Sequence, residues 1–345
     1  MKNILNKIVY RLCRKIGIFL FDKQLNKSLI DINSILIINW HGKIGDAIIS
    51  SFLIREIKEK TNIKISIVTT TNLSELYEIY NVDYIYTIDK KHNIFDLNNL
   101  ANKIKSIDAI IPLIGTLGFK DLFLIRKLMP IYVFSTDTSL KQSNEMFVQE
   151  INNKTVDEIY YKILEFIKIE NIYDKYYIPY IENKSQITKY DILFNSFGSR
   201  NDKSLSIRKS VSILIDINKV YPNYKIIVIY SPATKDIAQE IVKTVNQKNI
   251  ILAEDIVTIE DSIMLINESN LIISVDTAIV HIGIGMNKKI IAIYYQPGDI
   301  FNVWLPKKTS LIKIVFSLGI SNYVKKDMNN FNNKEILNHI NFFKA

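Results

Sequence analysis

Residues 34–60 read SILIINWHGKIGDAIISSFLIREIKEK. This stretch begins with a short apolar run, passes through a turn that contains Gly42 and Gly45, and ends in a longer segment rich in apolar residues. A short buried strand, a glycine-containing turn and a helix together form the repeating unit of a parallel α/β sheet. The stretch therefore predicts a βα unit.

The same pattern recurs along the chain, in two series. Apolar runs expected to be strands of the first series lie at residues 35–39, 64–68, 84–88, 108–113 and 131–134. Those of the second series lie at residues 191–195, 225–230, 249–252, 271–275 and 289–294. Longer helical patterns separate these runs, as parallel strands require. The sequence thus predicts an α/β protein with two Rossmann-like domains.

The length of 345 residues also favours two domains, because single hydrophobic cores usually stop growing at about 250–300 residues. Between the two series, a stretch rich in Tyr, Asn and Lys contains Pro179 and has no sustained periodicity, as is typical of a linker. The expected parts are an amphipathic helix within residues 1–33, a first Rossmann-like domain at 34–170, a linker at 171–189, a second Rossmann-like domain at 190–310 and a helical tail at 311–345.

Positive charge is concentrated at the N-terminus. Residues 1–30 contribute six of the nine net positive charges, and the rest of the chain is nearly balanced. Because a basic groove with aromatic residues is not indicated elsewhere, we expect no nucleic-acid partner.

The N-terminal segment also carries an apolar stripe. Its apolar residues recur at spacings of three and four, which predicts an amphipathic helix; they are Ile4, Leu5, Ile8, Val9, Leu12, Ile16, Phe19 and Leu20. The longest uncharged apolar run, residues 16–21, is far shorter than the roughly 18–20 residues that span a membrane, and no signal-peptide cleavage site follows. Two alternatives stay open: residues 4–20 lie on an anionic membrane, or the stripe packs on the protein.

Several other classes of site lack sequence support. The chain has a single cysteine, Cys13, so no intramolecular disulfide can form and a cytoplasmic location is expected. The four histidines are far apart and form no HxH or HExxH pattern, so we expect no metal site. The sequence contains no GxGxxG dinucleotide fingerprint, Walker pattern or GxSxG elbow.

Ligands of open α/β sheets bind where strands end and helices begin, and three such turns carry suitable side chains. In residues 39–46, two glycines precede Asp46, which is placed to cap the helix or to act as a base. In residues 195–203, small hydroxyl residues, Gly198 and two cations suit a phosphate group, although a solvated polar loop would look similar. In residues 274–281, Asp276 and Thr277 begin a helix, with a histidine one turn further; a capping Asp and a core histidine are the alternative.

Taken together, these three turns resemble glycosyltransferase family 9, the bacterial heptosyltransferase family of lipopolysaccharide and lipooligosaccharide cores. The resemblance covers most of residues 34–306 and rests on GKIGD at 42–46, FGS at 197–199 with Lys203, and SVDTAIVH at 274–281, followed by a strand and Pro297. It implies a GT-B fold, in which two Rossmann-like domains face each other across a cleft. The acceptor would bind the first domain and the nucleotide-sugar donor the second.

The resemblance also implies residue roles. Asp46 would be the general base that deprotonates the acceptor hydroxyl in an inverting reaction, with Gly42, Lys43 and Gly45 in the acceptor-side loop. The donor site would hold the diphosphate without a metal or other cofactor, because a lysine and a helix N-terminus stabilise the departing charge. The residues implied for it are Gly198, Ser199, Lys203, Asp276, Thr277, Ala278 and His281.

Three positions depart from the family pattern. Ala278 stands where glycine is usual, Ser204 follows the donor lysine in place of Trp-Pro, and Thr234 stands where a glutamate near the donor ribose is expected. The donor is therefore ADP-heptose or another nucleotide sugar. Because the implied acceptor is lipid-linked or a lipooligosaccharide, the protein is expected to act at the inner face of the cytoplasmic membrane. The alternative is a catalytically silent GT-B protein that binds nucleotides or acts as a scaffold.

Overall fold

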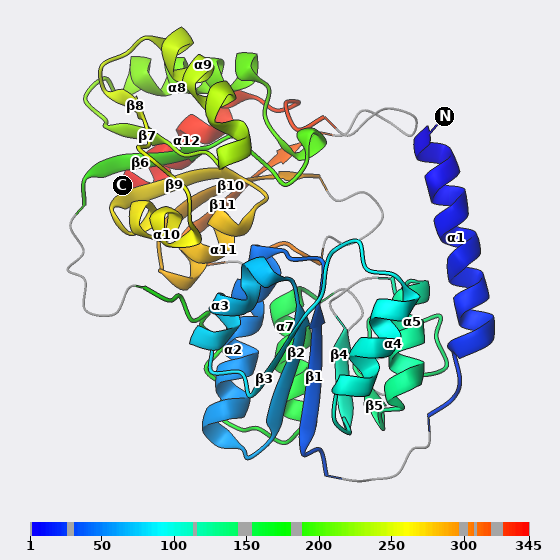
Figure 1. Cartoon of the computed structure of the whole chain (residues 1–345). Coiled ribbons are helices and arrows are strands. Elements are labelled where there is room, and N and C mark those ends of the chain that lie inside the picture. Colours follow the sequence, from blue (N-terminus) through cyan, green and yellow to red (C-terminus); the bar gives the residue numbers. More distant parts are fainter. Residues whose placement is uncertain are drawn as a thin grey trace. The chain divides into compact units, whose positions relative to one another are not determined.

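The computed structural model describes residues 2–25, 31–112, 116–143, 154–180, 188–296, 303–306, 309–318 and 327–344. Two compact units, Met1–Lys175 and Tyr176–Ala345, make up the chain and are called unit 1 and unit 2. Each is built around a parallel sheet with helices on both faces (Figure 1).

Unit 1 alternates strands with helices after an N-terminal helix. Its elements, in chain order, are α1 (Lys2–Phe21), β1 (Ser34–Asn39), α2 (Ile44–Lys60), β2 (Lys64–Thr69), α3 (Thr71–Ile79), β3 (Tyr84–Thr87), α4 (Ile94–Lys103), β4 (Ala109–Pro112), α5 (Phe119–Leu128), β5 (Tyr132–Val133) and α7 (Val156–Phe166).

The sheet of unit 1 has the order β3-β2-β1-β4-β5, with every pair parallel. Helices α2, α3 and α7 cover one face, whereas α4 and α5 cover the other, with α1 packed on α5 (Figure 1). The core on the α4–α5 face contains Leu36 and Ile38 of β1, so the quoted stretch is buried as expected. The strand order reverses between β1 and β4, and ligands of such sheets bind at the carboxyl ends of the strands at this switch point.

Unit 2 repeats the alternation. Its elements are β6 (Tyr190–Asn195), η1 (Asn201–Lys203), α8 (Ile207–Val220), β7 (Ile226–Val228), η2 (Pro232–Thr234), α9 (Lys235–Val245), β8 (Ile250–Leu252), α10 (Ile259–Asn267), β9 (Ser269–Val275), α11 (Ala278–Gly285), β10 (Lys289–Tyr295), β11 (Ile312–Ser317) and α12 (Asn333–Lys344).

The sheet of unit 2 has the order β11-β10-β9-β6-β7-β8 and is also entirely parallel. Helices α8, α9 and α12 lie on one face and α10 and α11 on the other (Figure 1). Here the order reverses between β6 and β9. The switch point of unit 2 thus falls between the two strands that precede the second and third candidate turns.

All ten predicted strands are confirmed within a few residues at their ends. The expected helical tail at residues 311–345 is confirmed only in α12, because its first part forms β11, which adds a sixth strand to the sheet of unit 2. This strand lies at the edge of the sheet, and only Val315 and Ser317 of its six residues are buried. A half-exposed edge strand carries a weaker apolar pattern than a central one, which explains the error.

The predicted N-terminal helix is also confirmed, as α1. Among the described residues, no helix is both long and apolar enough to cross a membrane.

Candidate functional site

The second and third candidate turns are brought together by the register of two neighbouring strands. In the pairing of β6 with β9, Asn195 lies opposite Ser274. Asn195 is the last residue of β6, and Ser274 is the second to last residue of β9. The two turns therefore begin at the same edge of the sheet. Side chains separated by about 80 positions in the sequence therefore form one site.

Asn195 joins the two turns. Its buried side-chain Nδ2 donates hydrogen bonds to Ser274 Oγ at 3.0 Å and Thr277 Oγ1 at 3.2 Å. It also donates to the carbonyl oxygen of Phe197 at 3.3 Å, and its Oδ1 accepts from the Phe197 N–H at 3.2 Å. One amide therefore holds both turns in place, as a fully satisfied buried polar group can.

An ion pair links the same two turns nearer to solvent. Lys203 Nζ lies 2.6 Å from Asp276 Oδ2, and the two side chains are 28% and 15% exposed. The lysine is thus held at the switch point by a partly shielded carboxylate. Because the ammonium has three donors, it can keep this contact while it binds an anion.

Gly198 allows the loop after β6 to close tightly. A Cβ at this position would lie 2.4 Å from the carbonyl oxygen of Lys203, which is too close for any side chain. The Gly198 N–H instead donates to Ser204 Oγ at 2.9 Å, and Ser204 Oγ donates to the Arg200 carbonyl at 3.1 Å. Ser199 lies exposed at the outer side of this loop.

The N-terminus of α11 lies beside these side chains. Thr277 is its N-cap residue in extended conformation, but its hydroxyl does not cap the helix and lies near Asn195 and Ser274. Ala278, the first helical residue, is partly exposed. A helix N-terminus without a side-chain cap offers N–H groups and a partial positive charge to an anion.

His281 lies one turn further along α11 and is 5% exposed. Burial lowers the pKa of its imidazole to about 4, with Asp276 acting in the opposite direction and Lys203 lowering it further. The ring is therefore neutral near pH 7 and packs near Tyr176, at a centroid distance of 6.4 Å. This histidine supports the turn from inside the fold.

The first candidate turn follows β1, at the switch point of unit 1. Gly42 adopts φ +64°, a left-handed conformation that favours glycine. A Cβ here would also lie 2.5 Å from Thr70 Oγ1 and 2.8 Å from Lys90 Cε. The turn thus lets the residues that follow β2 and β3 approach the residues that follow β1. Lys43 is exposed on this turn, and Gly45 is partly exposed.

Asp46 is the third residue of α2 and is 7% exposed. The interpretation of Asp46 as a simple N-cap is wrong, because Lys43 occupies the N-cap position. The Asp46 charge acts on two buried phenols: burial raises the pKa of Tyr160, and the charge of Asp46 raises it further. The same two effects raise the pKa of Tyr77.

Lys90, which was not predicted, lies near this turn together with Lys43 and two histidines. Partial burial, Lys43, His92 and Lys90 all lower the pKa of His41. His92 is 5% exposed, and its ring lies against that of Trp40 at a centroid distance of 4.7 Å and an interplanar angle of 41°. Because the pKa values of His41 and His92 are lowered, the basic surface at the carboxyl end of unit 1 consists of the exposed Lys43 and Lys90.

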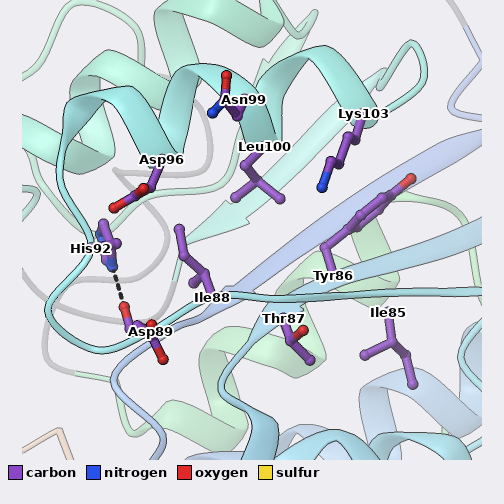
Figure 2. Close-up of a pocket in the computed structure, with 10 residues that line it drawn as sticks. All are labelled: Ile85, Tyr86, Thr87, Ile88, Asp89, His92, Asp96, Asn99, Leu100 and Lys103. Atoms are coloured by element: carbon purple, nitrogen blue, oxygen red, sulfur yellow. Dashed lines mark hydrogen bonds between the residues drawn. The ribbon is translucent and has the colours of Figure 1, made fainter.

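A cavity of about 510 Å³ lies next to this basic surface, between the end of β3 and α4 (Figure 2). Its lining residues are Ile85, Tyr86, Thr87, Ile88, Asp89, His92, Asp96, Asn99, Leu100 and Lys103. His92 Nδ1–H donates a hydrogen bond to the Asp89 carbonyl at 2.7 Å, and its buried Nε2 has no partner among the described residues. The mixed polar lining suits a hydroxyl-rich ligand.

Within the described parts of the chain, no group of three or more His, Cys, Asp and Glu side chains is placed to hold a metal ion. The positive charges at the switch point of unit 2 come from Lys203 and the start of α11.

The predicted site residues thus fall into two groups. The structure brings Gly198, Lys203, Asp276 and Thr277 together in unit 2, and it places Asp46 in unit 1 with the loop that precedes it. Sequence reasoning missed Asn195 as the link, although it is the last residue of a predicted strand. It also missed the cations after β3, which the DKKH run at residues 89–92 could have indicated.

Comparison with known proteins agrees with this arrangement. Residues 217–313, which include β9 and the start of α11, match the model of glycosyltransferase family 9 (heptosyltransferase). A curated relative from Escherichia coli (strain K12), provisionally described as lipopolysaccharide heptosyltransferase 4, is 23% identical over 319 residues. That alignment covers 86% of this chain and 86% of the relative.

Solved structures show the same fold. The glycosyl transferase family 9 protein from Veillonella parvula has a TM-score of 0.67 at 15% identity, covering 93% of this chain and all of that one. E. coli heptosyltransferase WaaC with ADP-2-deoxy-2-fluoro heptose has a TM-score of 0.62 at 13% identity, covering 90% and 100%. The two parallel sheets and these neighbours confirm the expected GT-B fold. Both the family model and the curated relative thus show that the chain is similar to glycosyltransferases of family 9.

Proposed function

We propose that this glycosyltransferase moves a heptose or a related sugar from a nucleotide donor to a lipopolysaccharide or lipooligosaccharide acceptor, with inversion and without a metal. The observation that carries the proposal is the position of the Lys203–Asp276 pair at the switch point of unit 2. Ligands of open α/β sheets bind at this position. The E. coli WaaC structure contains an ADP-2-deoxy-2-fluoro heptose, which supports an ADP-linked donor.

The donor diphosphate would lie against the start of α11 and the ammonium of Lys203. As the bond between the anomeric carbon and the diphosphate oxygen breaks, the leaving group gains negative charge. The lysine and the helix N-terminus stabilise that charge without the need to reorganise, since Asn195 and Asp276 already fix them. These groups take the role that a divalent cation plays in other transferases.

Asp46 would act on the acceptor. Its carboxylate takes the proton from the acceptor hydroxyl, whose oxygen attacks the anomeric carbon as the nucleoside diphosphate departs. This single displacement inverts the configuration at that carbon, and a positioned base contributes about 10²–10⁴ to the rate. The cations near the turn after β1 suit an acidic acceptor, and the cavity beside β3 suits its sugar hydroxyls.

A binding experiment on Lys203→Gln tests the donor site. Affinity for ADP, UDP, GDP and ADP-heptose is measured by calorimetry for the wild type and the variant. Loss of one charge-assisted contact costs about 1.5–3 kcal/mol, so we expect the affinity for the preferred ligand to fall about tenfold to a hundredfold.

Lys243→Gln is the matched control, because Lys243 is exposed on α9 in the same unit. Its affinity should equal that of the wild type. Equal affinities for all three proteins would contradict the donor site, and failure of every nucleotide to bind would favour a catalytically silent relative.

A further inference from the structure

Helix α1 has two different faces, and only one of them is packed. The packed face consists of Tyr10, Arg14, Gly17, Ile18 and Phe21, which recur at spacings of three and four. The apolar stripe predicted from the sequence lies on the opposite face of the helix. The expectation that this stripe packs on the rest of the chain therefore finds no support among the described contacts.

The packed face attaches α1 firmly to unit 1. Arg14 Nη2 donates to both carboxylate oxygens of Asp137, at 3.0 Å and 2.8 Å, and its Nε donates to the Leu117 carbonyl at 3.1 Å. Gly17 allows close contact, since a Cβ there would lie 3.1 Å from the Phe119 Cα. Phe21 meets the Phe119 ring edge to face, at 5.3 Å. The orientation of the helix on its unit is thus fixed.

The opposite face is apolar and exposed. Its side chains are exposed as follows: Leu5 61%, Ile8 56%, Val9 50%, Leu12 59%, Ile16 44%, Phe19 87% and Leu20 47%. Single exposed apolar residues are common, but a continuous stripe over about four turns marks an interaction surface. Because other residues already attach the helix, this stripe is not needed for folding.

Positive charge borders the stripe. Arg11 and Lys15 are exposed between the stripe and the packed face, and Lys23 is exposed just beyond the helix end. The helix contains no Asp or Glu. The acidic residue that follows it, Asp22, is buried and accepts hydrogen bonds from the backbone N–H groups of Lys141 and Gln142. The exposed surface of this segment is therefore both apolar and cationic.

We propose that the exposed face of α1 lies on the surface of an anionic lipid bilayer, with Leu12 and Phe19 in the acyl boundary and Arg11 and Lys15 at the headgroups. An apolar stripe bordered by cations is the pattern of an interfacial helix. The helix cannot cross the membrane, so it lies in the plane of the interface. This surface extends the proposed function by bringing unit 1, with Asp46, to a membrane that holds a lipid-linked acceptor.

Vesicle flotation with the full chain tests the proposal, and it needs neither donor nor acceptor. Its outcome is thus independent of the proposed reaction. The wild type should float with vesicles of phosphatidylcholine and phosphatidylglycerol but not with phosphatidylcholine alone. Raising the salt from about 0.1 M to about 1 M shortens the Debye length from about 10 Å to about 3 Å and should weaken binding.

Two double variants separate the apolar and the charged contributions. Leu12→Ser/Phe19→Ser should lower the partition coefficient at least tenfold. Arg11→Gln/Lys15→Gln should lower it about 25-fold at low salt, about fivefold for each charge. Val257→Ser is the control for the first variant, because Val257 is 73% exposed in unit 2, and its partition coefficient should not change.

Two further measurements test whether the variants are folded and whether α1 itself contacts the vesicles. The variants alter only exposed side chains, so their melting temperatures should equal that of the wild type. The chain has one cysteine, Cys13, which is exposed on α1, and an environment-sensitive dye attached there should shift to shorter wavelengths on anionic vesicles.

Failure of the wild type to float with anionic vesicles would overturn the proposal, as would equal flotation of the wild type and Leu12→Ser/Phe19→Ser. A dimer in light scattering that this variant abolishes, together with no flotation, would assign the stripe to a second copy of the chain instead.

Discussion

Asn195 illustrates how much a single buried side chain contributes to the proposed donor site. Its amide contacts both turns at the switch point of unit 2, through Ser274, Thr277 and Phe197. The sequence predicts each turn as a suitable phosphate loop, but it contains no signal that one side chain joins them. That information depends on the register of β6 with β9, which only the three-dimensional structure provides.

Gly198→Ala is expected to disturb the donor loop specifically. The added Cβ would lie 2.4 Å from the Lys203 carbonyl oxygen, so the loop must move and carry the lysine with it. Since misplacing a charged contact weakens it steeply, we expect affinity for the preferred nucleotide to fall at least tenfold. Calorimetry measures the affinity, and the melting temperature measured in parallel checks that the variant is folded. An affinity equal to that of the wild type would show that nucleotide binding does not require the tight loop.

For Asp46, the sequence predicts the position on a helix but not the neighbouring side chains. The sequence correctly places it at the start of a helix, and the structure gives it the third position of α2. Its neighbours Tyr77 and Tyr160 come from α3 and α7, which are distant in the chain. A single sequence cannot show that the charge of Asp46 acts on these phenols.

At the scale of elements, central strands were predicted well because they are buried on both faces. Ile35, Leu36 and Ile37 of β1 are fully buried, and such continuous apolar runs stand out in the sequence. The edge strand β11 was missed because its lysine and half-exposed residues weaken that pattern. The short strand β5 was predicted, although only Val133 of its two residues is buried.

Helix α11 should make the stability of the protein depend on pH through His281. Burial lowers the pKa of this histidine to about 4 in the folded state, whereas an unfolded histidine titrates near about 6.5. Above about pH 6.5 both states are neutral at this residue. As the pH falls below that value, His281 binds a proton in the unfolded state but stays neutral in the folded state. The free energy of unfolding therefore decreases.

Urea unfolding of the wild type and His281→Phe at about pH 7.5 and about pH 5 measures this effect. Between these two pH values, the free energy of unfolding of the wild type should fall by about 2 kcal/mol more than that of the variant. The difference between the two proteins isolates His281 from the other titrating groups. Equal losses would show that this histidine is protonated in the folded state.

At the scale of the whole molecule, the two candidate turns of unit 2 and the turn with Asp46 all lie at strand-order reversals. These are β6 beside β9 in unit 2 and β1 beside β4 in unit 1. The alternation of strands and helices predicts two parallel sheets, but it does not specify the strand order. The sequence could therefore identify the turns by their chemistry, whereas their common location at switch points required the structure.

In the proposed mechanism, the general base belongs to unit 1 and the residues that bind the donor belong to unit 2. A change at Asp46 should therefore affect transfer without affecting donor binding. Asp121→Asn is a matched control, because Asp121 is likewise the third residue of its helix, α5, in unit 1.

The most direct measurement is the rate of sugar transfer by Asp46→Asn at saturating donor, together with its affinity for that donor. We expect the rate to fall by about 10²–10⁴ while the affinity stays within twofold of the wild type, as a general base requires. Asp121→Asn should retain the rate of the wild type. A transfer rate for Asp46→Asn close to that of the wild type would contradict the assignment of Asp46 as the base.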